Sequence, residues 1–193
     1  MTSEDGTPPA RDRIVGAATA LFYAHGIRAV SADRIIERAK ITKVTFYRYF
    51  RTKDDLVVAY LEQQAARERA AVERIRESAA DSFEALGLLA QRIEAESRRT
   101  EFRGCPFINA AAEYADPAGP VRKVVARQRS WYRDTFAEML KQGGVPDPAE
   151  VAQEVALLRD GAMVSGSLDT GGNVGQALTS SILAVTNAHR PAP

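Results

Sequence analysis

Residues 35–56 read IIERAKITKVTFYRYFRTKDDL, and this stretch decides the fold of the first part of the chain. Ser31 precedes it and is a typical cap for one short helix, while Thr42 is a cap for a second. In the second helix Phe46 and Phe50 lie four residues apart and face inward, so the residues between them face outward. Two short helices joined by a brief link, with one shared apolar side, predict a helix-turn-helix.

The charge of the chain is concentrated in the same region. The whole sequence has a formal charge of +1, yet residues 27–53 contain eight basic and two acidic residues, a local +6 that leaves −5 for the remainder. Such asymmetry is expected of a protein that meets a polyanion with one end only. A basic run is also often no more than a solvated surface, so charge alone leaves both interpretations open.

The rest of the sequence carries the helical period of apolar residues and almost no strand alternation, which predicts an all-α fold. Capping residues, prolines at first-turn positions and glycines at ends divide it into about nine helices. The expected segments are 10–25, a short helix after Ser31, 43–50, a long helix from 53 towards 78, one from Asp81 to a break at 100–104, 106–114, one from Asp116-Pro117 to Gly143, 148–168, and a last helix capped by Asn173.

This pattern predicts two domains between two short ends. Residues 1–9 are expected to be a disordered leader, 10–52 a three-helix DNA-binding domain, 53–189 an effector-binding and dimerisation domain, and 190–193 a tail. No apolar stretch approaches the roughly 18 residues that a membrane span needs, and the first ten residues do not resemble a signal peptide. We therefore expect a cytoplasmic protein that does not bind membranes.

The reactive residues exclude several classes of protein. Cys105 is the single cysteine, which excludes an internal disulfide, and with only His25 and His189 beside it no zinc-ligand spacing exists. No arrangement of nucleophile, histidine and acid is visible, and no glycine-rich phosphate loop occurs. We expect no metal, no cofactor and no enzymatic activity.

The decisive stretch also resembles a known family. The Phe46-Tyr47-Arg48-Tyr49-Phe50 run, followed by Lys53 and Leu56, is similar to the DNA-binding domain of the tetracycline-repressor (TetR) family of bacterial regulators, over about residues 11–61. The resemblance implies a homodimeric, ligand-responsive repressor that binds double-stranded DNA at an inverted-repeat operator, with C-terminal helices that form the dimer interface and an effector pocket. Two positions depart from the family pattern: Lys40, where Gly is common, and Val44, where a small residue or Pro is usual.

The resemblance assigns roles to residues of the second short helix. Lys43, Val44 and Thr45 match base-reading positions, at which Lys43 can donate to guanine O6 or N7 and the other two can touch a thymine methyl. Tyr49 has an alternative role as a packing residue beside Phe50. The further expected contacts, mainly to phosphates, come from Ser31, Thr42, Tyr47, Arg48, Tyr49 and Lys53.

The effector region is predicted less specifically. Residues 104–114 resemble a Gly-Cys-x-Phe…Asn-x-x-x-Glu segment of one branch of the family, which does not name a ligand. Asn109 or Glu113 is a candidate polar anchor, although either can instead cap a helix or pair with Arg122. Cys105 begins a helix, where a redox role and an inert apolar role are both open. The predicted pocket residues are Leu89, Ile93, Phe107, Asn109, Glu113, Trp131 and Met163.

The last two long helices are expected to form the dimer interface. The helix over 148–168 is apolar or small over more of its circumference than one core-facing stripe needs, so a second copy is its expected cover. The predicted interface residues are Leu157, Gly161, Val164, Ser165, Leu168, Leu178 and Ile182. Two alternative functions remain at this stage, an architectural DNA binder without an effector and an all-α protein that binds a small molecule.

Overall fold

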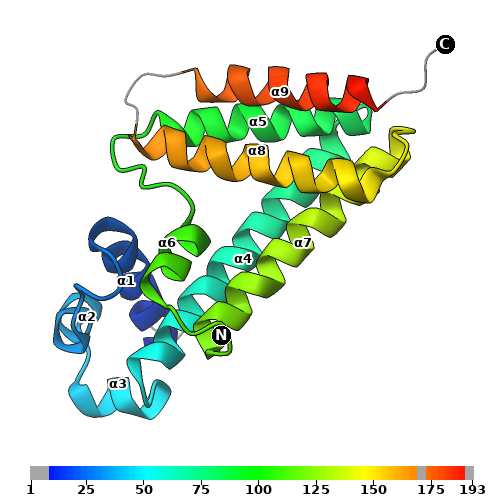
Figure 1. Ribbon diagram of the computed structural model, residues 1–193. Helices are drawn as coiled ribbons and strands as arrows, with labels where there is room; N and C mark the ends of the chain where they lie inside the picture. The colour runs from blue at the N-terminus through cyan, green and yellow to red at the C-terminus, as the bar shows by residue number, and fades with distance from the viewer. Residues whose placement is uncertain (1–8, 169–172, 190–193) are drawn as a thin grey trace. The chain divides into compact units, whose positions relative to one another are not determined.

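The computed structural model describes residues 9–168 and 173–189, which form nine α-helices and no strand (Figure 1). The predicted all-α fold is confirmed. Residues 1–8 of the expected leader and the whole expected tail, 190–193, lie outside the described residues. The helices are α1 (Ala10–His25), α2 (Ala32–Ala39), α3 (Lys43–Tyr49), α4 (Lys53–Ser78), α5 (Ser82–Ser97), α6 (Pro106–Glu113), α7 (Pro120–Gln142), α8 (Pro148–Leu168) and α9 (Val174–Ala188).

Helices α1, α2 and α3 pack against one another as the predicted helix-turn-helix with its supporting helix. Ser31 and Thr42 cap α2 and α3, because their hydroxyls accept hydrogen bonds from the N–H groups of Arg34 and Thr45, both at 3.2 Å. Phe46 and Phe50 are buried, as their spacing predicted. The caps and the aromatic pair together fix where α3 begins and which side of it faces solvent.

The turn between α2 and α3 depends on an unusual backbone at Lys40. This residue ends α2 with φ 52° and ψ 53°, and its N–H donates to the carbonyl of Glu37. A non-glycine residue in this left-handed region costs about 1–2 kcal/mol. The conformation explains why glycine is common at this position in the family that the sequence resembles, and the chain keeps the same turn with a lysine.

Helices α4 and α7 are the two longest elements, and their starting points are set differently. A reciprocal cap opens α4, because the Thr52 hydroxyl accepts from the N–H of Asp55 and the Asp55 carboxylate accepts from the N–H of Thr52. The expected start of α7 at Asp116 was wrong. The Asp116 carboxylate instead accepts from the N–H of Ala118 at 2.9 Å and closes a turn, and the helix begins at Pro120.

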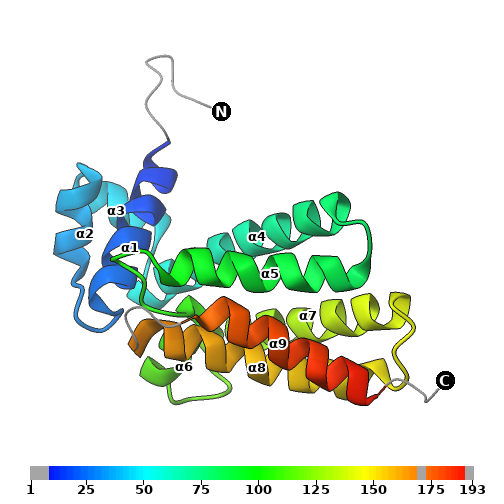
Figure 2. The same cartoon turned by 90° about the horizontal axis from the view of Figure 1, so that it is seen from above.

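Helices α5, α8 and α9 lie side by side, as the two views of the chain show (Figures 1 and 2). Their facing sides bury a cluster of apolar residues from α5, α7, α8 and α9. The residues of this cluster with almost no solvent exposure include Ala90, Met139, Leu140, Val151 and Val155. This core holds together α5, α7, α8 and α9, which also line a small hollow.

The chain divides into two compact units, and the division differs in extent from the expected domains. Among the described residues, one unit contains those from Pro9 to Ala65 together with Pro106–Val125, and the other contains Ala66–Cys105 together with 126–168 and 173–189. The helix-turn-helix unit therefore includes α6 and the first part of α4, beyond the expected limit at residue 52. None of the described helices combines the length and apolar character that a bilayer span requires.

Candidate nucleic-acid interface and effector hollow

The first turn of α3 presents its side chains to solvent. Val44 is 81% exposed, although it is a large apolar residue, and the Lys43 side chain is 67% exposed. The ammonium group of Lys43 forms an ion pair with Asp33 at 3.7 Å. An ion pair this exposed contributes little to stability, so the ammonium group can readily exchange Asp33 for another anion. Thr45 is half-buried, and its hydroxyl lies 2.9 Å from that of Thr42.

The aromatic residues of α3 are partly packed and partly exposed. Tyr47 packs edge-on against Phe46, with ring centroids 5.2 Å apart, and remains 44% exposed. Tyr49 is 41% exposed, and the guanidinium of Arg48 lies over its ring at 5.3 Å. The Tyr49 ring thus contacts Arg48 and remains accessible to a partner.

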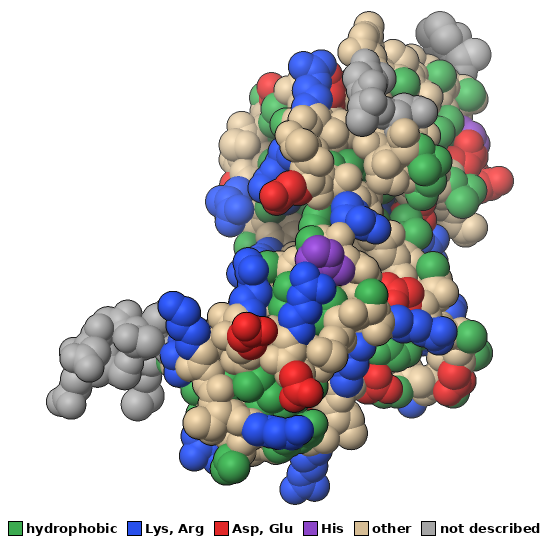
Figure 3. Space-filling view, turned by 90° about the vertical axis from the view of Figure 1, so that its left-hand side faces the viewer, with side chains coloured by type: hydrophobic (Ala, Val, Ile, Leu, Met, Phe, Trp, Pro, Cys, Tyr) green, Lys and Arg blue, Asp and Glu red, His purple; other side chains and the backbone are tan. Residues whose placement is uncertain are grey.

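Many basic side chains, with a few acidic ones among them, lie on the surface of the same unit (Figure 3). Arg28, Arg34, Arg38 and Lys40 are exposed, as is Arg51 just after α3. Lys53 differs from these exposed residues, because it is half-buried. Its ammonium group donates to the carbonyl of Arg28 at 3.4 Å. Burial lowers the pKa of Lys53, while the charges of Glu113 and Asp54 oppose this shift.

Glu113 lies in the helix-turn-helix unit. It ends α6, and its carboxylate accepts hydrogen bonds from the N–H groups of Ile27 at 2.8 Å and Arg28 at 2.6 Å. The neighbouring Tyr114 donates its hydroxyl to Asp54 at 2.8 Å, and Arg122 donates to the carbonyl of Tyr114 at 3.0 Å. The carboxylate of Glu113 therefore binds the turn after α1, and neither caps a helix nor pairs with Arg122 in the part of the chain that the structure describes.

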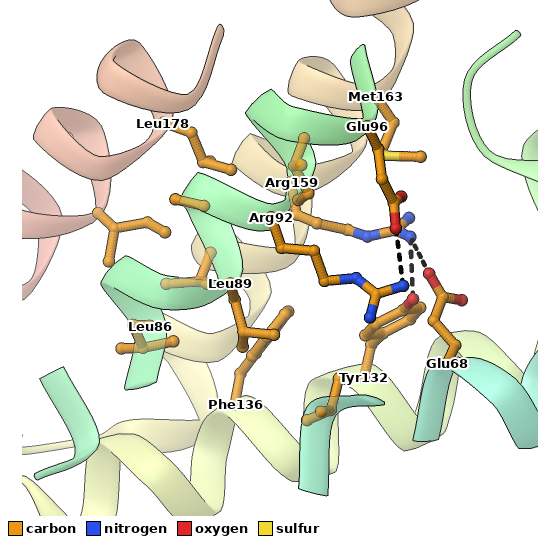
Figure 4. Close-up of a pocket in the computed structure, with 15 residues that line it drawn as sticks. Glu68, Leu86, Leu89, Arg92, Glu96, Tyr132, Phe136, Arg159, Met163 and Leu178 are labelled. Carbon is orange, nitrogen blue, oxygen red and sulfur yellow. Dashed lines mark hydrogen bonds and ion pairs between the residues drawn. The ribbon is translucent and has the colours of Figure 1, made fainter. Parts of the chain in front are cut away.

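The second unit contains a small hollow, about 40 Å³ in volume, that is partly open to solvent. Helices α4, α5, α7, α8 and α9 line it, and Figure 4 shows a group of polar side chains at one end. Such a combination of an apolar wall and a few polar groups is typical of small-molecule sites. The apolar lining consists of Val72, Leu86, Leu89, Ala90, Ile93, Phe136, Val155, Met163, Leu178 and Ile182.

Arg159 is the centre of the polar end of this hollow. It is only 6% exposed, and its guanidinium donates to Tyr132 at 2.9 Å, Glu68 at 3.2 Å and Asp160 at 3.1 Å, as well as to the sulfur of Cys105 at 3.4 Å. Burial opposes the charge of Arg159, but Cys105, Tyr132 and Glu68 outweigh this effect and raise its pKa. Burial raises the pKa of the Tyr132 hydroxyl as well.

A second ion pair lies at the same end of the hollow. Arg92 and Glu96, one turn apart on α5, are 2.7 Å apart, and each side chain is about one-third exposed. Figure 4 shows both side chains on the same side as Tyr132 and Arg159. Arg92 and Glu96 are the most accessible of the polar residues that line the hollow.

The structure brings together part of the predicted pocket. Leu89, Ile93 and Met163 line the hollow. Phe107 and Asn109 belong to α6 in the other unit, with Glu113, and do not line it. Trp131 packs at the edge of the apolar core, where the guanidinium of Arg69 lies over its ring. Arg159 was not predicted, and its signal in the sequence is the Arg159-Asp160 pair within an otherwise apolar stretch of α8.

Cys105 is buried beside Arg159 of α8, in the segment between α5 and α6 and directly before α6 begins. Gly104 next to it has φ 75°, and a Cβ there would lie 2.9 Å from the carbonyl of Met163. The chain therefore approaches α8 closely at this point, and glycine permits it. No group of three or more metal-ligating side chains occurs in the part of the chain that the structure describes.

One face of α8 is apolar and uncovered. Leu157 is 67% exposed, Val164 42% and Leu168 75%, and Gly161 and Ser165 on this helix are also exposed. A shallow groove runs beside Leu157, Gly161 and Ser165 and continues along α9. Leu178 and Ile182 differ from their predicted role, because both are buried in the core of their own chain; Leu183, 45% exposed, is the large apolar residue that α9 presents.

Comparisons with known proteins identify the family. Residues 14–60 match the model of bacterial regulatory proteins of the tetR family, and residues 82–173 match a tetracyclin repressor-like C-terminal domain. The solved structure of SCO4454, a TetR-family transcriptional regulator from Streptomyces coelicolor, is 40% identical, covers 93% of this chain and 95% of its own, and has a TM-score of 0.88.

Two further relatives agree with this match. The HTH-type transcriptional regulator YjdC of Escherichia coli is 27% identical over 159 residues, which are 79% of this chain and 81% of that protein. A putative tetr-transcriptional regulator from Streptomyces avermitilis, 23% identical, shares the fold with a TM-score of 0.84 over 94% of this chain and 98% of its own. The chain belongs to the TetR family and is a DNA-binding transcriptional regulator, not an enzyme.

Proposed function

We propose that the protein is a homodimeric repressor that binds an inverted-repeat operator through α3 and is released by a small molecule bound in the hollow. One observation supports the DNA-binding mode most directly. The first turn of α3 exposes Lys43 and Val44, while Phe46 and Phe50 on the opposite side fix the helix in its unit. A recognition helix needs this division, because it enters the major groove with its N-terminal residues.

Specificity is assigned to the first turn and affinity to the residues around it. Lys43 donates to guanine O6 or N7, and Val44 and the methyl of Thr45 contact thymine methyl groups. The remaining contacts are to phosphates, which position the helix without reading bases. We assign these contacts to Ser31, Thr42, Tyr47, Arg48, Tyr49 and Lys53.

Dimerisation is supported by the uncovered face of α8. Leu157, Val164 and Leu168 are large apolar side chains exposed along a single helix, and such a row is costly to leave in water. Gly161 and Ser165 lie between them and allow a second helix to approach closely. A two-fold contact through this face joins two copies of the chain, and each brings one α3 to the DNA.

The effector role is supported by the hollow and by the contact of its lining residue Arg159 with the segment before α6. Arg159, which lines the hollow, donates to the sulfur of Cys105, and the next residue begins α6. A molecule that displaces the Arg159 side chain therefore acts on the start of α6. We expect a mainly apolar molecule with a polar group directed to the end formed by Arg92 and Tyr132, and a higher affinity of this molecule for the conformation that does not bind DNA.

The presence of an apolar hollow with a buried arginine at one end argues against the architectural alternative. An architectural DNA binder needs only a filled core behind its DNA-binding domain, and it gains nothing from a buried cation beside an apolar cavity. The remaining alternative, a small-molecule binding protein that ignores DNA, is disfavoured by the family match. A regulator of this kind acts where the bacterial chromosome lies, in the cytoplasm.

Selection from a pool of random duplex DNA with the purified protein tests the proposal. We expect enrichment of an inverted repeat whose half-sites lie about one helical turn apart, because two α3 helices read one face of the duplex. Enrichment of single, unrepeated sites would contradict the dimeric mode. Recovery of bent or flexible sequences without a common base pattern would support the architectural alternative.

A further inference from the structure

The carboxylate of Glu113 binds the turn between α1 and α2 from 85 residues away in the sequence. Its two oxygens accept from two consecutive backbone N–H groups, Oε1 from Ile27 at 2.8 Å and Oε2 from Arg28 at 2.6 Å. A carboxylate that accepts from two N–H groups forms charge-assisted hydrogen bonds, which are shorter and stronger than neutral ones. This contact is specific in geometry as well as charge.

The turn needs such an acceptor because α1 has ended. The N–H of Gly26 still donates to the carbonyl of Phe22, but Gly26 has φ 85°, and the chain then leaves the helical path. Ile27 is only 3% exposed, so its N–H has little access to water. Glu113 supplies the acceptors that α1 no longer provides, and unsatisfied donors at such a position are costly.

The residue after Glu113 binds the other end of the helix-turn-helix. Tyr114 donates its hydroxyl to Asp54 at 2.8 Å, in the first turn of α4. Lys53 beside Asp54 donates to the carbonyl of Arg28 at 3.4 Å. Helices α2 and α3 lie between Arg28 and Lys53 in the chain. Glu113 therefore binds the segment that precedes α2, and Tyr114 binds the first turn of α4, which follows α3.

We propose that Glu113, assisted by Tyr114, is a positioning residue for DNA recognition. It holds the ends of the segment 28–53 together and so fixes the orientation of α3 for base reading, without touching DNA itself. The inference rests on DNA binding through α3 and on no assumption about an effector. The carboxylate is required, because a neutral side chain of the same shape supplies only one acceptor to two donors.

Glu113→Gln tests the proposal because electrostatics and positioning predict opposite changes in the affinity for DNA. The substitution removes a negative charge, so simple electrostatics predicts tighter binding to the polyanionic duplex. We expect the opposite for the selected duplex, about a tenfold loss of affinity, the factor that corresponds to a typical hydrogen bond. Affinity for a scrambled duplex at low salt should not fall, since phosphate contacts do not require an exact orientation of α3.

Matched variants separate positioning from charge and from folding. Glu77→Gln removes an equal charge from an exposed position on α4 and should not weaken binding. Tyr114→Phe retains the ring and removes only the contact with Asp54, so it should weaken specific binding less than Glu113→Gln does. All variants are measured as full chains, by fluorescence anisotropy with the same labelled duplexes.

Amide hydrogen exchange gives a second readout that a general loss of stability would not produce. In Glu113→Gln the N–H groups of Ile27 and Arg28 should exchange at least tenfold faster, while the amides in the core of α8 keep their wild-type rates. Equal affinity of Glu113→Gln and Glu77→Gln for the selected duplex would overturn the proposal. If the wild-type chain selects no duplex, the proposed function fails, and the exchange rates at Ile27 and Arg28 then decide whether Glu113 holds the turn.

Discussion

The hydroxyl of Tyr132 lies 2.9 Å from Nη2 of Arg159, and the guanidinium of Arg159 also lies over the Tyr132 ring, 4.3 Å from its centroid. The arginine is thus held by a hydrogen bond and a cation–π contact from one residue, in addition to its ion pairs with Glu68 and Asp160. A buried charge is tolerated only with such a full set of partners.

Arg159→Met should lower the free energy of unfolding by about 2 kcal/mol, because it removes the buried cation beside Glu68, whereas Asp160 keeps its ion pair with Arg129. Urea denaturation followed by circular dichroism measures the change. Arg92→Met, at the accessible pair on α5, should change stability by less than about 0.5 kcal/mol. A stability of Arg159→Met equal to that of the wild type would show that the methionine packs as well as the ion network.

Lys43→Ala should relax the preference for one base pair in each half-site, at a cost of about 1–3 kcal/mol for the preferred sequence. The measurement is a set of binding titrations with duplexes that differ at single positions. Lys141→Ala, an exposed lysine on α7, serves as the control. If Lys43→Ala weakened binding to every duplex equally, Lys43 would contact the phosphate backbone instead.

Leu157→Glu should convert the dimer to a monomer at micromolar concentration, because it places a charge within the proposed apolar contact on α8. Sedimentation velocity reports the change in mass. Ala126→Glu, which adds the same charge to an exposed position on α7, should leave the mass unchanged. A wild-type protein that is monomeric at this concentration would refute the dimer.

Leu89→Trp should fill the hollow and reduce the binding of a neutral apolar probe such as N-phenyl-1-naphthylamine at least tenfold. Fluorescence enhancement of the probe measures its binding to the wild type and the variant. Leu183→Trp adds the same ring to the surface of α9 and should leave probe binding unchanged. Binding of the probe to Leu89→Trp with wild-type affinity would place the site outside the hollow.

The sequence predicted the local structure well wherever a residue acts on its neighbours. Ser31 and Thr42 cap the helices they were expected to cap, and Phe46 and Phe50 are buried at the expected spacing. These features depend on contacts within four residues, which periodicity reveals. The predicted start of α7 was wrong because an aspartate can either cap a helix or close a turn. The Asp116 carboxylate closes a turn, since it accepts from the N–H of Ala118.

Features that depend on distant residues were not predicted. The partners of Glu113 lie 85 residues away or more, and those of Arg159 come from α4, α7 and the segment before α6. Leu178 and Ile182 have the spacing of either a core or an interface, and only the packing of α9 on α5 and α8 shows that they belong to the core. Helical periodicity shows which residues share a face, not what covers that face.

The affinity of the protein for a full inverted repeat, compared with its affinity for a duplex that carries one half-site, tests the central claim most directly. Two linked α3 helices should bind the full repeat at least a hundredfold more tightly, with the chains bound in pairs, because the second contact is intramolecular once the first has formed. Equal affinity for the two duplexes, with one chain bound to each, would contradict the claim.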